Sequence, residues 1–157
     1  MKILLTSENV SDTRAVGEAL AGCLIPDGAL LLSGDLGTGK TVLTQGLAEG
    51  LGIDSTEVQS PTFTLIREHQ GTRGDLVHID LYRLEGQELD ALGLWEILAG
   101  PGVKAVEWSE RMSYPIDDGI NATLRVAAST GREIEIEAVD LENRIRDALA
   151  QIAARLA

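Results

Sequence analysis

The sequence has little cysteine, little lysine and no long apolar stretch. Its one cysteine, Cys23, cannot form a disulfide within the chain, and its apolar neighbours Leu20 and Leu24 favour a core position. No apolar run approaches the roughly 18–20 residues that a membrane-spanning helix needs. The N-terminal segment turns polar from Thr6, too early for a secretory signal. We therefore expect a cytoplasmic protein with no membrane association.

Positive charge is also scarce. Thirteen Lys and Arg residues face 25 Asp and Glu residues, which gives a formal net charge of −12. Such a surface repels a polyphosphate backbone, and no Lys/Arg cluster interrupts it, so tight direct binding of nucleic acid is not expected. The only lysines are Lys2, Lys40 and Lys104. The position of Lys40 in a glycine-rich segment is therefore informative.

The 157 residues fit one compact domain, which we expect to span residues 1–157. Apolar spacing and turn signals predict strands at 2–6, 29–33, 76–80 and 103–107, and a strand-like stretch at 58–66. They predict helices at 8–24, 40–51, around 89–98 and at 141–157, a turn at 70–74, and a hairpin of residues 121–128 and 132–139. This order predicts an α/β fold with a mixed sheet covered by helices.

A phosphate-binding motif follows the strand predicted at 29–33. Residues Gly34–Thr41 (GDLGTGKT) match the pattern G-x-x-x-x-G-K-[ST], the Walker A motif or P-loop, completely. Glycines let backbone N–H groups turn toward a triphosphate, and the helix N-terminus adds a positive dipole end. We expect Lys40 to reach the β- and γ-phosphates and the Thr41 hydroxyl to bind Mg²⁺. Asp35 would repel phosphates, so its side chain should point away.

Two acidic residues are candidates for completing a magnesium site. Asp80 ends the apolar segment LVHID and Glu107 ends VKAVE. Ligands in such sheets bind at the carboxyl ends of the strands, where both acids should lie. Either acid could instead be structural, by capping a helix or by pairing with an arginine such as Arg83. A P-loop without any acidic partner would be a poor magnesium site.

The segment Ser60–Thr64 lies between the P-loop helix and Asp80, where P-loop switches place a loop that senses the γ-phosphate. Thr62 could contact magnesium or orient the attacking water there, although a polar strand entry would read the same way. Trp108 could stack on the base, contact a partner or pack in the core.

Several motifs of other P-loop proteins are missing. Asp80 is followed by Leu81-Tyr82-Arg83 rather than by a D-x-x-G switch, and no Asn-Lys pair of a guanine box exists. Guanine specificity is therefore not supported. A small-molecule kinase would carry an arginine-rich lid, but the arginines are scattered along the chain. Such a kinase remains the alternative, together with a module that binds ATP without hydrolysing it.

Four motifs together resemble one family. GDLGTGKT, SPTFTL, HIDLYRL and VEWSE occur here in the order and spacing of the TsaE (YjeE) ATPases of bacterial tRNA threonylcarbamoyladenosine biosynthesis. The resemblance spans Thr13 to Glu110 and continues weakly through residues 131–133. It implies a P-loop NTPase-like three-layer sandwich with a mixed, mainly parallel central sheet, followed by a C-terminal hairpin and helix.

The resemblance also implies a function. The chain would be an ATPase that depends on Mg²⁺, is slow on its own, and is required for threonylcarbamoylation of the adenosine next to the anticodon in tRNAs that read ANN codons. It would act on a TsaB–TsaD partner complex without transferring the threonylcarbamoyl group, and would meet tRNA only through that complex. The acidic surface agrees with such an indirect role.

Site residues carry over by position. The catalytic residues would be Lys40, Thr62, Asp80 and Glu107, and the metal ligands Thr41, Glu107 and Asp80. The nucleotide-binding residues would be Asp35, Leu36, Gly37, Thr38, Gly39, Lys40, Thr41, Trp108 and Arg132.

Overall fold

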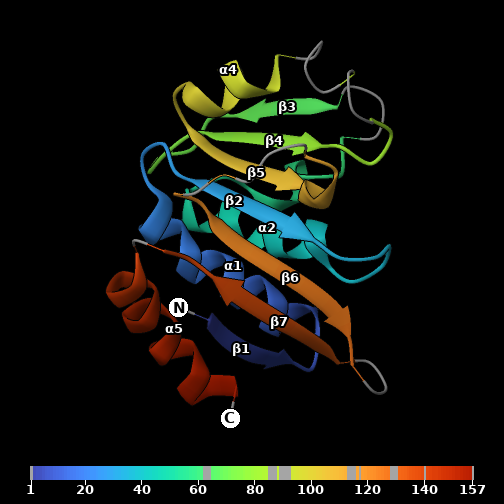
Figure 1. Ribbon diagram of the computed structural model, residues 1–157. Helices are drawn as coiled ribbons and strands as arrows, with labels where there is room; N and C mark the ends of the chain where they lie inside the picture. The colour runs from blue at the N-terminus through green and yellow to red at the C-terminus, as the bar shows by residue number, and fades with distance from the viewer. Residues whose placement is uncertain are drawn as a thin grey trace.

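Within the part of the chain that the structure describes, seven strands form one sheet in the order β1-β7-β6-β2-β5-β4-β3 (Figure 1). This computed structural model describes residues 2–61, 65–84, 88, 93–112, 116, 118–127, 131–139 and 141–156. The strands are β1 (Lys2–Ser7), β2 (Ala29–Ser33), β3 (Ile66–His69), β4 (Leu76–Asp80), β5 (Val103–Glu107), β6 (Ile120–Val126) and β7 (Arg132–Glu137).

The sheet is mixed, with a parallel centre. β2 pairs in parallel with β5 and β6, and β5 pairs in parallel with β4. β3, β7 and β1 join by antiparallel pairing. Strands β1, β2, β4, β5 and β6 consequently run in one direction, and their carboxyl ends meet at the right-hand edge in Figure 1. The predicted mixed, mainly parallel sheet is confirmed.

Helices cover both faces of this sheet. The helices are α1 (Val10–Leu24), α2 (Lys40–Gly50), α4 (Leu94–Ala99) and α5 (Glu142–Leu156), with short 3-10 turns η1 (Ser55–Glu57) and η2 (Ser109–Arg111). Successive side chains of β2 enter different cores: Leu30 and Leu32 pack with α1, α2 and α5, whereas Leu31 packs with residues of α4 and of β4 and β5. Side chains alternate across a strand, so these two cores lie on opposite faces and the fold has three layers.

The strand predicted over residues 58–66 is wrong for most of its length. Residues 58–61 are irregular, and β3 begins only at Ile66. Pro61 has no N–H to donate to a neighbouring strand, and Leu65 has a positive φ of 64°. The Pro61 carbonyl instead accepts from the N–H of Leu65 at 3.0 Å. Residues 62–64, including the candidate Thr62, lie outside the described residues.

The loop between β2 and α2 needs glycine at two points. Gly34 has φ +141°, and a Cβ there would lie 2.4 Å from the Leu124 carbonyl oxygen of β6. Gly39 has φ +105° and precedes the first residue of α2. Both backbone conformations are rare for residues with a side chain. The loop is thereby pressed against β6 before the chain enters α2.

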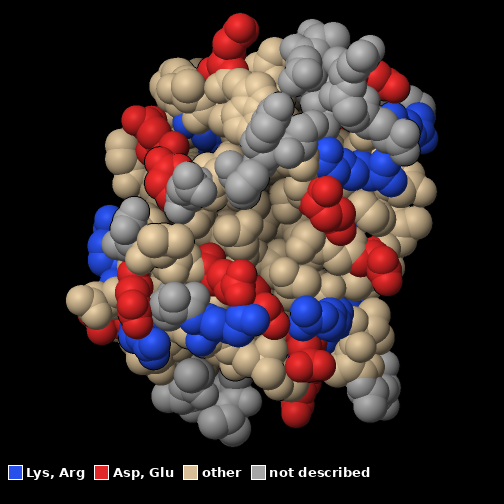
Figure 2. Space-filling view, in the orientation of Figure 1, with Lys and Arg blue, Asp and Glu red and all other residues tan. Residues whose placement is uncertain are grey.

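The outer face of the hairpin that β6 and β7 form is polar, as its period-two pattern predicts. Lys2 pairs with Glu135 at 3.1 Å and with Glu137 at 3.2 Å, and Arg125 pairs with Glu135 at 3.4 Å. On the face shown in Figure 2, basic side chains form separate groups with acidic side chains beside them. Within the described part of the chain, no helix is long and apolar enough to cross a membrane.

Helices α1 and α2 pack backbone to backbone. A Cβ on Gly46 would lie 2.0 Å from the Arg14 carbonyl oxygen, and one on Gly17 would lie 2.1 Å from the Leu43 carbonyl oxygen. A methyl group at either position would push the helices apart, because neither neighbour is a movable side chain. Since α2 carries the end of the P-loop, this contact positions the loop relative to α1.

We predict that Gly46→Ala lowers the free energy of unfolding by about 2 kcal/mol or more, the range of severe overpacking. Gly22→Ala is the matched control, because Gly22 lies in α1 and a Cβ added there would have no atom within 4 Å. That variant should gain up to about 1 kcal/mol from helix propensity. Urea unfolding measures both. Equal stabilities of the two variants would contradict the close packing.

Candidate functional site

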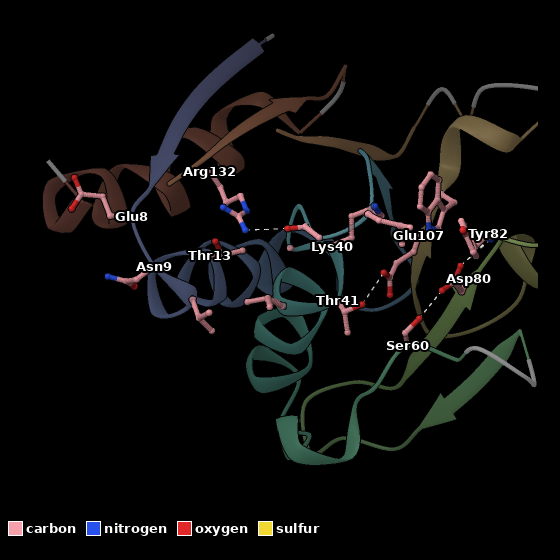
Figure 3. A pocket seen from close by; sticks show the side chains of 16 residues that line it. Glu8, Asn9, Thr13, Lys40, Thr41, Ser60, Asp80, Tyr82, Glu107 and Arg132 are labelled. Atoms are coloured by element: carbon pink, nitrogen blue, oxygen red, sulfur yellow. Dashed lines mark hydrogen bonds between the residues drawn. The ribbon is translucent and has the colours of Figure 1, made fainter. Parts of the chain in front are cut away.

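A cavity of about 690 Å³ opens at the carboxyl edge of the sheet (Figure 3). This volume is in the usual range for small-molecule sites. Its walls come from the start of α1, the P-loop and α2, the ends of β4 and β5, and β7. The lining residues are Glu8, Asn9, Val10, Thr13, Leu36, Gly37, Gly39, Lys40, Thr41, Val42, Ser60, Asp80, Tyr82, Glu107, Trp108 and Arg132.

Cations and a hydroxyl engage the carbonyl oxygens of the P-loop. Lys40 Nζ donates to the carbonyls of Gly34 and Asp35, the latter at 2.8 Å. The Thr38 hydroxyl also donates to the Asp35 carbonyl, at 2.8 Å. Arg132, which reaches across from β7 in Figure 3, donates to the carbonyls of Gly37 and Thr38. The carbonyl oxygens of Gly34, Asp35, Gly37 and Thr38 are therefore all bonded to side chains of this chain.

The Lys40 ammonium is almost buried, with 5% of the residue exposed. Burial lowers its pKa, and the nearby carboxylates of Glu107, Glu110, Asp80 and Asp35 oppose that shift. The acidic surroundings thus favour the charged form of this lysine.

Glu107 connects the P-loop helix to the centre of the sheet. The Thr41 hydroxyl donates to Glu107 Oε1 at 2.9 Å, and His78 Nε2 donates to Glu107 Oε2. Glu107 and His78 are 3% and 0% exposed. The carboxylate is thereby fixed from two sides, with one oxygen on Thr41.

Asp80 lies beside Glu107, since these residues are neighbours in the parallel register of β4 and β5. Its Oδ2 accepts from the Ser60 hydroxyl at 2.6 Å and its Oδ1 accepts from the Tyr82 N–H at 2.9 Å. The two strands thus place two nearly buried carboxylates next to each other, at the end of the sheet where the P-loop begins.

Trp108 lines the cavity together with Glu107, although adjacent residues of a strand point to opposite faces. The reason is that β5 ends at Glu107 and Trp108 has a left-handed backbone with φ 60°. Its ring centre lies 4.2 Å from Lys40 Nζ and 4.9 Å from the Tyr82 ring. The lysine therefore faces an aromatic ring on one side, a favourable cation–π contact.

Glu110 of η2 is bonded to the first residue of the P-loop. Its Oε2 accepts from the N–H of Gly34 at 3.1 Å. A carboxylate on the first amide of the motif shows that this end of the loop favours an anion. The carboxylate also adds negative charge near Lys40.

The donor set suits a hard divalent cation. Thr41, Glu107 and Asp80 offer hydroxyl and carboxylate oxygens, the ligands that Mg²⁺ prefers, whereas a zinc site would need His or Cys ligands. Among the described residues, no cluster of three or more His, Cys, Asp or Glu side chains is arranged to hold a metal alone. Mg²⁺ usually binds with one or two carboxylates plus phosphate oxygens and water, and these residues fit that requirement.

Comparison with known proteins gives the family. The family model described as threonylcarbamoyl adenosine biosynthesis protein TsaE matches residues 7–138. The chain belongs to the TsaE family. A TsaE protein from Nostoc sp. is 45% identical over 139 residues, which cover 86% of this chain and 84% of that protein. One from Bacillus subtilis is 40% identical over 132 residues, which cover 83% and 82%.

The fold agrees with this membership. The crystal structure of Bacillus subtilis YdiB superposes on this TsaE-family chain with a TM-score of 0.73 at 30% identity, covering 99% of this chain and 96% of that one. The resemblance stated from the four motifs is thus confirmed, as is the predicted P-loop NTPase-like three-layer α/β fold with a C-terminal hairpin and helix.

Most residues predicted for the site of this TsaE-family chain surround the cavity. Lys40, Thr41, Asp80, Glu107, Trp108 and Arg132 line it, as do Leu36, Gly37 and Gly39 of the loop. Asp35 and Thr38 do not line it; the side chain of Asp35 is exposed and that of Thr38 is buried under the loop. Thr62 falls outside the described residues.

Other lining residues carry no sequence signal that singled them out. They are Glu8, Asn9, Val10, Thr13, Val42 and Tyr82, whereas Ser60 belongs to the segment Ser60–Thr64 that the sequence indicated as a switch-like loop. Four of these lie at the start of α1, where Asn9 caps the helix by accepting from the N–H of Asp12 at 2.9 Å. A cap of this kind indicates a helix start, but not that the helix start faces a cavity formed with the P-loop and the ends of β4 and β5.

We predict that Asp80→Ala lowers the free energy of unfolding by about 1–3 kcal/mol, because the Tyr82 N–H and Ser60 hydroxyl lose a charged acceptor. Asp80→Asn should be distinctly more stable than Asp80→Ala, since the amide oxygen still accepts from Tyr82 and repulsion with Glu107 is removed. Urea unfolding compares the three proteins. If Asp80→Ala were as stable as the wild type, Asp80 would not be held as described.

Proposed function

We propose that this chain is a magnesium-dependent ATPase that acts on a TsaB–TsaD partner complex in threonylcarbamoylation of the adenosine next to the anticodon in tRNAs reading ANN codons. Membership of the TsaE family supports the pathway. One observation carries the ATPase: Lys40, the Thr41–Glu107 pair and Asp80 meet at one cavity beside a complete P-loop.

The basic residue of the site would bind phosphate groups, and its oxygen ligands would bind the metal ion. Lys40 supplies a positive charge at the loop and would bind the β- and γ-phosphates. Thr41, Glu107 and Asp80 would hold Mg²⁺, which neutralises phosphate charge when it is bound. The Thr41 hydroxyl could bind the ion through its oxygen while its O–H group continues to donate to Glu107 Oε1. Asp80 is fixed by Ser60 and Tyr82 in a position to orient a water.

The residues around the cavity give a reason why this chain would hydrolyse ATP slowly in the absence of partner proteins. P-loop hydrolases that turn over fast have a residue that orients the attacking water and a further cation near the transferred phosphate. In the described part of the chain, Lys40 and Arg132 are the cations lining the cavity, and both are bonded to the P-loop itself. We propose that the partner complex speeds hydrolysis. The acidic surface, with a net charge of −12, suits contact with tRNA through those partners alone.

Phosphate release is the direct test. We predict slow ATP hydrolysis that needs Mg²⁺ but no acceptor molecule, and that rises when TsaB and TsaD are added. Lys40→Ala should abolish it. Hydrolysis that appears only with a phosphate-accepting small molecule would support a kinase instead and contradict the proposal.

Glu107→Ala separates turnover from binding. Because Glu107 acts through the metal, we predict that this variant lowers Mg²⁺-dependent turnover by about 100-fold or more, while ATP affinity falls less than tenfold. Glu18→Ala is the control, because Glu18 is an exposed carboxylate of α1 that does not line the cavity. Unchanged turnover in Glu107→Ala would remove Glu107 from the site.

Trp108 provides an optical signal. Its ring contacts Lys40, so a nucleotide that engages the lysine should change its fluorescence. The second tryptophan, Trp95 of α4, is 37% exposed and does not line the cavity. We predict that Trp95→Phe keeps the response to MgATP and that Trp108→Phe loses it. If saturating MgATP did not change the fluorescence of the Trp95→Phe variant, Trp108 would lie outside the site.

A further inference from the structure

We propose that Arg132 is a positioning residue: its guanidinium fixes the two peptide planes at the apex of the P-loop that carry the N–H groups of Thr38 and Gly39. This inference rests on the proposed nucleotide site and adds a function for a residue outside the motif. Arg132 is the first residue of β7, far along the chain from Thr41, where the motif ends.

The contacts are made to the apex of the loop. Arg132 Nε donates to the Thr38 carbonyl at 3.1 Å, and one terminal nitrogen donates to the Gly37 carbonyl at 3.0 Å. The other terminal nitrogen donates to the Gly131 carbonyl at 2.9 Å. Each guanidinium nitrogen thus has a backbone acceptor, and the planar group bridges two consecutive carbonyls of the loop.

Peptide geometry transmits this contact to two N–H groups of the loop. In a trans peptide the C=O and the following N–H point in opposite directions. Fixing the carbonyl of Gly37 therefore fixes the N–H of Thr38, and fixing the carbonyl of Thr38 fixes the N–H of Gly39. Gly37 has φ +77° and Gly39 has φ +105°, so without an external contact this backbone has much conformational freedom to lose. Arg132 restricts it before any ligand binds.

The strand that carries Arg132 is itself held on both sides. Arg132 is paired with Ser7 of β1 and with Val126 of β6. The loop packs on the same strand β6 through Gly34, next to the Leu124 carbonyl. Strand β6 contacts the P-loop and also pairs with the backbone of Arg132. The sheet therefore sets the distance between the loop and this arginine.

A lysine could not substitute fully. A single ammonium offers a point charge, whereas the two loop carbonyls are engaged by two nitrogens of one rigid plane. The shape of the guanidinium therefore matters here in addition to its charge. This role also differs from a direct contact of Arg132 with the γ-phosphate, which would matter for ATP and not for ADP.

The test uses Arg132→Ala, Arg132→Lys and the control Arg125→Ala. Arg125 lies on the same hairpin, is 53% exposed, and its side chain pairs with Glu135, so its removal changes the net charge equally without touching the loop. Circular dichroism shows which variants fold. If Arg132→Ala does not fold, Arg132→Lys carries the test.

The first measurement needs no nucleotide. Amide hydrogen exchange, resolved residue by residue by NMR in the free protein, should be about tenfold faster or more at Thr38 and Gly39 in both Arg132 variants. Arg125→Ala should match the wild type. Unchanged exchange at Thr38 and Gly39, or complete restoration by lysine, would overturn the inference.

The second measurement compares affinities for MgADP and MgATP. Loop amides surround the α- and β-phosphates, which both nucleotides possess. Arg132→Ala should therefore weaken both by a similar factor, about tenfold or more, as expected when charged hydrogen bonds that order the loop are lost. Weakening of ATP alone would show a γ-phosphate contact and overturn the inference. If the wild type binds neither nucleotide, the proposed function fails, while the exchange measurement still decides the role of Arg132.

Discussion

The loop between β2 and α2 depends on where its carbonyl oxygens are bonded. Carbonyls turned into the cavity would repel an anion, so the loop favours an anion only if its carbonyls have partners elsewhere. Here Lys40 and the Thr38 hydroxyl bond those at the start of the loop, and Arg132 bonds those at its apex. Three separate segments, the loop itself, α2 and β7, must be in place for this arrangement.

The site combines several negative charges with few positive ones. The chain carries a net charge of −12, and Asp80, Glu107 and Glu110 all lie near one lysine. These carboxylates oppose the lowering of the pKa of Lys40 that burial causes, and they are themselves held by Ser60, Thr41 and backbone N–H groups. Two carboxylates side by side repel each other unless a cation lies between them. A divalent ion and a polyphosphate would balance each other's charge there, which connects the acidic strand ends to the P-loop.

Much of the fold and of the candidate site could be predicted from local sequence patterns. Mainly apolar runs identified β2, β4 and β5 to the residue, because strands buried on both faces need apolar side chains at most positions. The motif located the loop, and the parallel sheet brought Asp80 and Glu107 together. The predicted strand at 58–66 failed because Pro61 and the positive φ of Leu65 interrupt the pairing that its apolar residues favour. The contacts of Arg132 with the P-loop, and the place of Asn9 beside the cavity, depend on how distant strands and helices meet, which no local pattern contains.

Calorimetric titration of the folded protein with MgATP tests directly whether the P-loop binds a nucleotide. We predict saturable binding of one nucleotide per chain, which requires Mg²⁺ for full affinity and is lost in Lys40→Ala. An absence of heat on titrating MgATP or MgADP into wild-type protein, both alone and together with its proposed partner proteins, would contradict the nucleotide site.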